Sequence, residues 1–140
     1  YVRRRIFPVG RLDKGTAGLL LLTDDGAFCH RLMSPKHHVE KEYSVVLERP
    51  LTMEDVACLE AGVYLENGEK TLPCRIFDVK GTSCRIVLRE GKYHQVKRMF
   101  ASRGNRVLSL FRPSLGGLIL DPALTPGQFR ELTAEEVKAL

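Results

Sequence analysis

The sequence lacks any hydrophobic run long enough to cross a membrane. Its longest apolar stretch, residues 19–22, is far shorter than the roughly 18–20 residues that a transmembrane helix needs. The basic N-terminal segment is not followed by the apolar region of a secretory signal. We therefore expect a cytoplasmic protein that makes no contact with a membrane.

The sequence also lacks the residue spacings that are typical of metal-binding and nucleotide-binding sites. The four cysteines form no CxxC pair, and the adjacent pairs Cys29-His30 and His37-His38 match no metal-ligand spacing. We expect buried, reduced thiols and no metal. The sequence contains no P-loop and no GxGxxG motif, and no Ser/His/Asp order stands out. Motifs therefore give no support to nucleotide binding or to a Ser/His/Asp hydrolase.

What the sequence does have is an uneven distribution of positive charge. The 140 residues are 44% hydrophobic and 28% charged, which is ordinary for one soluble globular domain, and the net charge is +5. Residues 85–112 hold eight Lys or Arg but only one acid, Glu90, and residues 1–41 hold eight against four. Residues 42–84 reverse this balance. Two basic blocks favour a polyanionic partner, and nucleic acid fits best.

Hydrophobic periodicity and turn residues predict a mixture of strands and helices. The apolar run predicts one strand buried on both faces, and Lys80-Gly81-Thr82 predicts a hairpin loop. Thr52 and Thr133 are typical helix N-caps. We expect strands at residues 18–23, 41–48, 73–79, 83–89, 107–111 and 118–120, and helices at residues 27–33, 53–61, 93–103 and from 134. Strands and helices do not alternate regularly, which predicts an α+β fold with a mixed, largely antiparallel sheet.

One carboxylate stands out because it lies between cations. Asp13 follows Arg11 by two residues and precedes Lys14, just ahead of the apolar run. In an extended segment Arg11 and Asp13 would share a face. Nearby cations favour the ionised form, which suits a nucleophile. A surface salt bridge is the simpler interpretation.

Two further segments suggest contact with RNA. Tyr43 opens a strand after a cationic and polar run, where an aromatic ring can stack on an unpaired base. Residues 90–98 form a basic junction between a strand and a helix. These residues alone indicate an RNA-binding protein and leave open whether it is an Asp-dependent enzyme. Glycoside cleavage by Asp13 with Glu90 as a second carboxylate is a further possibility at this point.

Three motifs resemble those of the RsuA-type rRNA pseudouridine synthases. Residues 10–26, GRLDKGTAGLLLLTDDG, are similar to the first motif of that family, Lys41-x-Tyr43 to the second, and residues 90–99, EGKYHQVKRM, to the third. Their order and spacing agree over nearly the whole chain. The forms YHQVKRMF and SPKHH are most similar to members that act on small-subunit (16S) rRNA. The resemblance implies the pseudouridine synthase fold and isomerisation of a specific uridine, without metal or organic cofactor.

The resemblance also implies roles for individual residues. Asp13 would be the essential carboxylate, either attacking the sugar C1′ or promoting loss and recapture of the base. Lys97 would be its basic partner, with Arg98 as second choice. Tyr43 would stack on the flipped uracil and could assist removal of the C5 proton. The remaining expected contacts with substrate are Arg11 in the loop or in the space left by the nucleotide, Leu88 beneath the base, and Arg89, Lys92, Arg103 and Arg106 on phosphates. His94 is expected to cap or orient its helix.

The chain also departs from the family pattern. Family members usually begin with a small RNA-binding domain resembling ribosomal protein S4, followed by a strand with a Lys-Pro-x-Gly turn, and neither is present. We therefore expect residues 1–140 to be the catalytic domain of a longer protein. Ala17 stands where the family commonly has Ser or Thr. The partner would be 16S rRNA or a small-subunit assembly intermediate, and the protein a monomer. A non-catalytic rRNA-binding or ribosome-assembly module on the same fold is the alternative.

Overall fold

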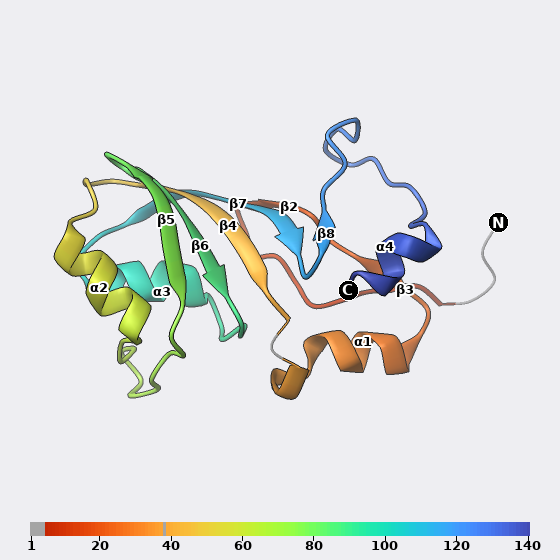
Figure 1. The fold of residues 1–140 in the computed structure, drawn as a ribbon, viewed down its shortest axis with the longest axis horizontal. Helices are drawn as coiled ribbons and strands as arrows, with labels where there is room; N and C mark the ends of the chain where they lie inside the picture. Colours follow the sequence, from red (N-terminus) through yellow and green to blue (C-terminus); the bar gives the residue numbers. More distant parts are fainter. Residues whose placement is uncertain (1–4, 38) are drawn as a thin grey trace.

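The computed structural model describes residues 5–37 and 39–140 and is shown as a ribbon in Figure 1. Its strands are β1 (Phe7–Pro8), β2 (Thr16–Gly18), β3 (Leu22–Thr23), β4 (Lys41–Leu47), β5 (Arg75–Lys80), β6 (Ser83–Leu88), β7 (Val107–Leu115) and β8 (Leu118–Ile119). Its helices are α1 (Gly26–Met33), the 3-10 turn η1 (Pro35–His37), α2 (Met53–Ala61), α3 (Gln95–Ser102) and α4 (Ala134–Lys138). No helix in these residues is long and apolar enough to span a membrane.

The main sheet has the strand order β2-β7-β4-β6-β5, with β8 paired to β7. In the part of the chain that the structure describes, only the β2–β7 pair of this sheet is parallel, which confirms the predicted α+β fold with a largely antiparallel sheet. The single strand predicted at residues 18–23 is wrong. Gly18 ends β2 in the main sheet, whereas Leu22 begins β3, which pairs with β1. Leu20 is 40% exposed, so this run is not buried on both faces.

Local capping signals place the helices. Asp25 accepts hydrogen bonds from the backbone N–H groups of Ala27 and Phe28 at the start of α1. Thr52 caps α2 through the N–H of Asp55, and Thr133 forms a capping box with Glu136 at the start of α4. Each bond satisfies an N–H that has no partner inside its own helix. The predicted starts of α2 and α4 are confirmed, and α1 begins at Gly26, one residue before the expected residue 27.

Several predicted boundaries differ from the structure, such as the strand expected at residues 73–79, which spans residues 75–80. Two of the differences have identifiable reasons. The helix expected from residue 93 begins at Gln95, because His94 has a left-handed backbone (φ 47°) that a helix cannot include. The strand expected to end at Phe111 continues to Leu115. The β4–β7 register shifts between Glu42 and Ser44, so β7 accommodates Pro113, which has no N–H, at a bulge.

The larger of two hydrophobic clusters lies under one end of the sheet, where α2 and α3 pack on β4, β5 and β6 (Figure 1). Leu59, Ile86, Met99 and Phe100 are completely buried in it. We call this cluster the large core; it contains Val45, Leu47, Leu51, Val56, Leu59, Leu65, Ile76, Cys84, Ile86, Leu88, Val96, Met99, Phe100 and Leu110. The sequence pattern predicted the inward face of α3 correctly, because Val96, Met99 and Phe100 recur at helical spacing.

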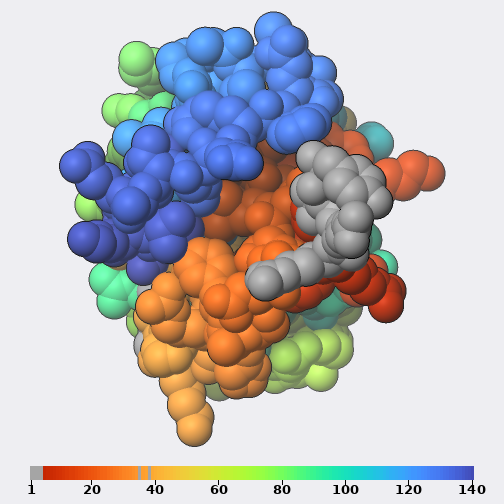
Figure 2. Space-filling view, turned by 90° about the vertical axis from the view of Figure 1, so that its right-hand side faces the viewer, coloured from red at the N-terminus to blue at the C-terminus, as the bar shows by residue number. Residues whose placement is uncertain are grey.

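The smaller cluster gathers segments from both ends of the chain. Figure 2 looks at this end of the molecule, where the blue C-terminal segment and the orange α1 come together. We call this cluster the small core; it contains Val9, Leu19, Leu21, Leu32, Leu115 and Leu118, with Leu140 packed against it. The backbone N–H of Gly117 donates to the carbonyl of Ala139 at 3.0 Å, which fastens the C-terminus to the β7–β8 turn.

One face of β4 changes character along its length. Val45 and Leu47 point into the large core, and Tyr43 packs on its edge. Lys41 belongs to the same face, because side chains two residues apart on a strand point the same way. The face that begins as core therefore ends in an aromatic ring and an ammonium group.

Of the four cysteines, all free, only Cys84 is buried and the other three are partly exposed, so the expectation of buried thiols holds for one.

Candidate active site

A tight turn presents Asp13 ahead of β2. The backbone N–H of Thr16 donates to the carbonyl of Asp13 at 2.8 Å, and Gly15 at the third position of the turn has φ +85°. A type II turn requires a positive φ at this position, which glycine adopts without strain. The Asp13 side chain is 28% exposed. The sequence DKGT thus forms a turn that holds a carboxylate at the surface beside a sheet edge.

The N-terminal end of α3 packs against this turn. Lys97 Nζ donates a hydrogen bond to the carbonyl of Lys14 at 3.2 Å. His94 Nε2 lies 3.9 Å from Asp13 Oδ1, and the His94 ring stacks on Tyr93 with the two centroids 3.8 Å apart. His94 occupies the N-cap position of α3, as expected, but its side chain makes no capping hydrogen bond there. Its left-handed backbone instead directs the ring toward Asp13, and such strained residues cluster at functional sites.

Tyr43 and Arg112 complete the group from the sheet. Arg112 is only 3% exposed, and its guanidinium donates from Nε and Nη2 to the carbonyl of Leu19 at 3.1 and 2.7 Å. The bulge in β7 falls opposite Tyr43, between the pairs Glu42–Ser114 and Ser44–Phe111. A buried guanidinium with hydrogen bonds to a carbonyl keeps its charge and is held rigidly.

The pKa of Tyr43 reports the proximity of these groups. Burial raises the pKa of the phenol, the positive charge and a side-chain hydrogen bond of Arg112 act to lower it, and the Asp13 carboxylate raises it further. The net shift is upward, so the neutral phenol is favoured at physiological pH. Tyr43 is therefore suited to stacking and to donating a hydrogen bond. It is poorly suited to removing a proton as a base.

The other predicted site residues lie in four places. Arg11 is exposed on the segment that leads to the Asp13 turn. Leu88 is buried in the large core, opposite Lys41 in the β4–β6 ladder. Arg98 does not share the contacts of Lys97: its Nε pairs with Glu66 at 2.7 Å and its Nη1 donates to the carbonyl of Tyr93. Arg89 and Lys92 line a separate pocket.

The contacts of Glu90 are with residues other than Asp13. Its carboxylate accepts the backbone N–H of Leu72 at 2.6 Å and the side-chain amide of Gln95 at 2.9 Å, and lies 3.4 Å from Lys92 Nζ. Its side chain is 11% exposed. A carboxylate that already accepts these bonds fastens β6 and α3 to the segment before β5. It is therefore poorly placed to act as a second catalytic acid.

Sequence reasoning missed two residues of this site. Arg112 was assigned only to the general basic block, although an Arg-Pro pair inside an apolar strand is a signal of a bulge. Thr16 belongs to the first motif, and its hydroxyl is buried without a hydrogen-bond partner among the described residues. Buried polar atoms are nearly always paired, so this hydroxyl is available to a bound group. In residues 5–37 and 39–140, no three His, Cys, Asp or Glu side chains converge as a metal site would require.

Comparison with known proteins places this geometry in context. Residues 2–102 match the family described as RNA pseudouridylate synthase. The RNA pseudouridine synthase YtzG of Bacillus subtilis is 51% identical over 96% of this chain and 58% of its own length. Ribosomal small subunit pseudouridine synthase A of Escherichia coli K12 is 44% identical over 97% of this chain and 59% of its own. The chain therefore spans a little under 60% of the length of these two relatives.

Solved structures agree with the sequence comparison. A crystal structure of a pseudouridylate synthase matches with a TM-score of 0.92 at 42% identity, covering 96% of this chain and 59% of that one. The archaeal box H/ACA sRNP Nop10-Cbf5 complex contains a chain that matches with a TM-score of 0.58 at 17% identity, which shows likeness of fold alone.

Proposed function

Because the chain belongs to the RNA pseudouridylate synthase family, we propose that it isomerises a uridine in ribosomal RNA to pseudouridine. The most specific target that the comparisons support is 16S rRNA or a small-subunit assembly intermediate, since several relatives are small-subunit synthases. A protein that modifies ribosomal RNA works where ribosomes assemble, which supports a cytoplasmic location. Residues 1–140 would form the catalytic domain of a longer protein that acts as a monomer.

One observation carries the proposal: Asp13 stands on a fixed turn beside Tyr43, His94 and the turn-binding Lys97. In the reaction the bond from C1′ to N1 of the uracil breaks, the base turns, and a bond from C1′ to C5 forms. C5 loses its proton and N1 gains one. Asp13 would either attack C1′ or stabilise that face of the sugar while the base is free, and both routes need the ionised carboxylate.

The uridine must leave its stack to expose C1′ and C5. We assign Tyr43 to stacking on the flipped uracil, with Leu88 in the apolar layer beneath the site, because stacking needs no ionised phenol. The unpartnered Thr16 hydroxyl would bond to an oxygen of the nucleotide. Arg11, exposed near the turn, would order the loop or enter the space that the base leaves.

The assigned basic partner of Asp13 is Lys97 rather than Arg98. Lys97 bonds the backbone of the Asp13 turn, whereas Arg98 bonds Glu66 and the carbonyl of Tyr93. Arg98 would then fix the junction before α3. The proposed reaction uses side chains of this chain and no metal or organic cofactor.

Two alternatives give different results. A non-catalytic RNA-binding module on the same fold would bind rRNA without needing the Asp13 charge. A glycoside hydrolase would release free uracil, but the prior engagement of Glu90 with Leu72, Gln95 and Lys92 speaks against a second catalytic acid.

The test is direct detection of pseudouridine. The longest natural form of the protein is incubated with 16S rRNA transcript and with partly assembled small subunits. The RNA is then treated with a carbodiimide that marks pseudouridine and mapped by primer extension. We expect a new stop with the wild type and a loss of rate of roughly 10⁴-fold or more with Asp13→Asn, the scale seen when a catalytic group is removed. Asp24→Asn, an exposed carboxylate of the same segment, is the matched control and should retain activity.

No stop on either RNA with the wild type would contradict the proposal. Retained salt-sensitive binding in both proteins would then indicate the RNA-binding module. Release of free uracil would indicate the hydrolase.

A further inference from the structure

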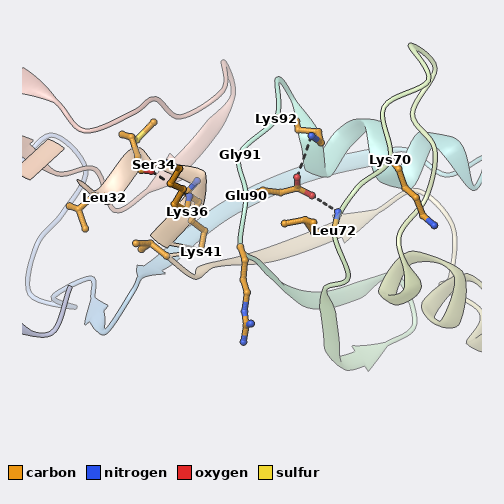
Figure 3. A pocket seen from close by; sticks show the side chains of 12 residues that line it. Leu32, Ser34, Lys36, Lys41, Lys70, Leu72, Glu90, Gly91 and Lys92 are labelled. Carbon is orange, nitrogen blue, oxygen red and sulfur yellow. Dashed lines mark hydrogen bonds and ion pairs between the residues drawn. The ribbon is translucent and has the colours of Figure 1, made fainter. Parts of the chain in front are cut away.

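A pocket of about 540 Å³ lies beside the site, between the end of α1 with η1 and the junction before α3. Figure 3 shows Lys36 and Lys41 on one side of it, and Leu72, Glu90 and Lys92 on the other. Its charged lining consists of five cations and one acid: Lys36, Lys41, Lys70, Arg89, Lys92 and Glu90. These five positive side chains repel one another, and one carboxylate can compensate only part of their charge.

The acids near this pocket do not neutralise all of its cations. Glu90 is bound to Leu72, Gln95 and Lys92 within the wall itself. Glu40 pairs with Arg89 at 3.2 Å in a well-exposed contact, where an ion pair contributes little. Lys36 and Lys41 have no such ion pair among the described residues. Lys70, on the other side, likewise has no ion pair among the described residues and lies over the Tyr64 ring. Uncompensated charge is therefore present on both sides of the pocket, with Lys36 and Lys41 together on the α1 and η1 side.

Lys41 is the most informative of these cations. Burial lowers the pKa of its ammonium group, Arg112 lowers it further, and Glu90 opposes them. The group is close against Gly91, where a Cβ atom would lie 2.7 Å from Lys41 Nζ. No described residue accepts a hydrogen bond from this ammonium within 3.5 Å. An ammonium held partly out of water without an acceptor is destabilised, and an anionic ligand would reverse that cost.

The pocket also adjoins the reacting groups. Lys41 precedes Tyr43 by two residues on the same face of β4, and Arg112 influences the pKa of both side chains. An anion bound at Lys41 would therefore lie beside the uracil stacked on Tyr43, two residues away along β4. In a strand of RNA, the anion at that distance from a base is a backbone phosphate.

We propose that this pocket holds a backbone phosphate next to the flipped uridine, with Lys41 and Lys36 as its principal contacts. The inference rests on the proposed function and adds to it the place where the strand leaves the site. Phosphate contacts fix the register of a bound strand without reading its sequence. The pocket would thus set which uridine reaches Asp13 along the backbone.

The test is the salt dependence of binding to 16S rRNA transcript, measured by filter binding over a series of salt concentrations. Each lysine that neutralises a phosphate of a single strand contributes about 0.7 to the slope of log affinity against log salt. We expect Lys41→Met to weaken binding and reduce the slope by about that amount. Lys36→Met should do the same, and because Lys36 is exposed this substitution leaves the fold intact. The matched control is Lys80→Met at the exposed β5–β6 hairpin, which should leave the slope unchanged.

Two readouts keep this inference separate from the proposed function. Pseudouridine formation by the wild type tests the function, and the slope tests the pocket. If the wild type forms pseudouridine but Lys41→Met and Lys36→Met both keep its slope, the pocket proposal is overturned. If the wild type forms none but both variants lose slope relative to Lys80→Met, the pocket is an RNA phosphate site on a non-catalytic module. Equal loss in all three variants also overturns the pocket, since the effect would come from net charge.

Discussion

The large core and the small core hold their parts of the chain in different ways. In the large core two helices cover the sheet, and side chains such as Leu59 and Phe100 are wholly excluded from water. Ion pairs add to it, with Arg103 Nε 2.9 Å from Asp55 Oδ1 between α3 and α2. The small core has six buried residues drawn from both ends of the chain, and none is completely buried.

The candidate active site lies between these two regions. Asp13 comes from the segment between Val9 and Leu19 of the small core, whereas Tyr43 and Lys97 come from elements of the large core. β7 crosses both, and Arg112 lies on it between them. The geometry of the site therefore depends on how firmly the two regions are joined. That join includes the β2–β7 ladder, the two hydrogen bonds from Arg112 to Leu19 and the bond from Lys97 to the carbonyl of Lys14.

The largest expected effect comes from breaking the large core. Phe100→Ala should lower the free energy of unfolding by about 3–5 kcal/mol, because it removes a fully buried ring from a region that cannot collapse around the cavity. Leu118→Ala in the small core should cost about 2 kcal/mol, at the low end for such a change, because its surroundings can relax. Urea unfolding measures both. An equal or reversed order would contradict the distinction between the cores.

The next effect comes from separating the two regions at their ladder. Gly18 has φ +125°, and a Cβ atom there would lie 2.3 Å from the backbone oxygen of Arg112. We expect Gly18→Ala to lower the free energy of unfolding by about 2 kcal/mol or more and to reduce activity, because the backbone of β7 must move. The control is Gly68→Ala, since Gly68 also has a positive φ (+88°) but has no atom within 4 Å of the added carbon. It should cost about 1–2 kcal/mol. Equal costs in urea unfolding would show that the close approach to β7 is unimportant.

Substitution of Arg112 tests the contact between the two regions more selectively. Arg112→Met should cost about 1–3 kcal/mol, because the carbonyl of Leu19 loses both donors. It should also raise the pKa of Tyr43 further, since Arg112 acts to lower it, and ultraviolet titration of the phenol measures this shift. Arg112→Lys should preserve much of the Tyr43 pKa while losing the paired hydrogen bonds.

Activity separates these variants further. Because a displacement of about 1 Å can cost roughly 100-fold in rate, we expect both Arg112 variants to be at least tenfold slower in pseudouridine formation. Full activity in Arg112→Lys would show that charge alone, without the bonds to Leu19, maintains the site.

The smallest effect concerns the C-terminal part of the small-core region. The Arg130 guanidinium and the backbone at Thr133 lower the pKa of Glu136 from 4.5 to about 2. The stabilising contact is therefore complete above pH 4.5 and is lost as the pH falls toward 2. We expect the amides of α4 to exchange faster with solvent over that interval, while those of α3 stay protected. Hydrogen exchange measures this, and Glu136→Gln should remove the pH dependence, whereas Glu135→Gln should keep it.

Much of the fold could be predicted because its signals are local. The caps at Asp25, Thr52 and Thr133 each depend on atoms within three residues, so the sequence contains all that decides them. The same holds for the hairpin at residues 80–82. The sequence also placed Asp13 between two cations ahead of the apolar run, whereas the tight turn that holds it before β2 is seen only in the structure.

What could not be predicted depends on distant partners. Four successive leucines carry no alternation, so the burial of Leu19 and the exposure of Leu20 are decided by packing against segments far along the chain. The role of Arg112 depends on a bulge that only the pairing of β4 with β7 reveals. His94 reaches Asp13 because its backbone is left-handed, a conformation that the sequence KYHQ does not indicate.

The parallel pairing of β2 with β7 has a consequence for folding during synthesis on the ribosome. The hydrogen bonds from Arg112 to Leu19 span 93 residues, so the first motif leaves the ribosome long before its partner strand exists. At about 5–20 residues per second this interval is roughly 5–20 s. Throughout it the Asp13 segment lacks its ladder, and closing so long a loop comes late in folding. The proposed site can therefore be completed only after β7 has been synthesised, and we expect a nascent chain that ends before Arg112 to be inactive.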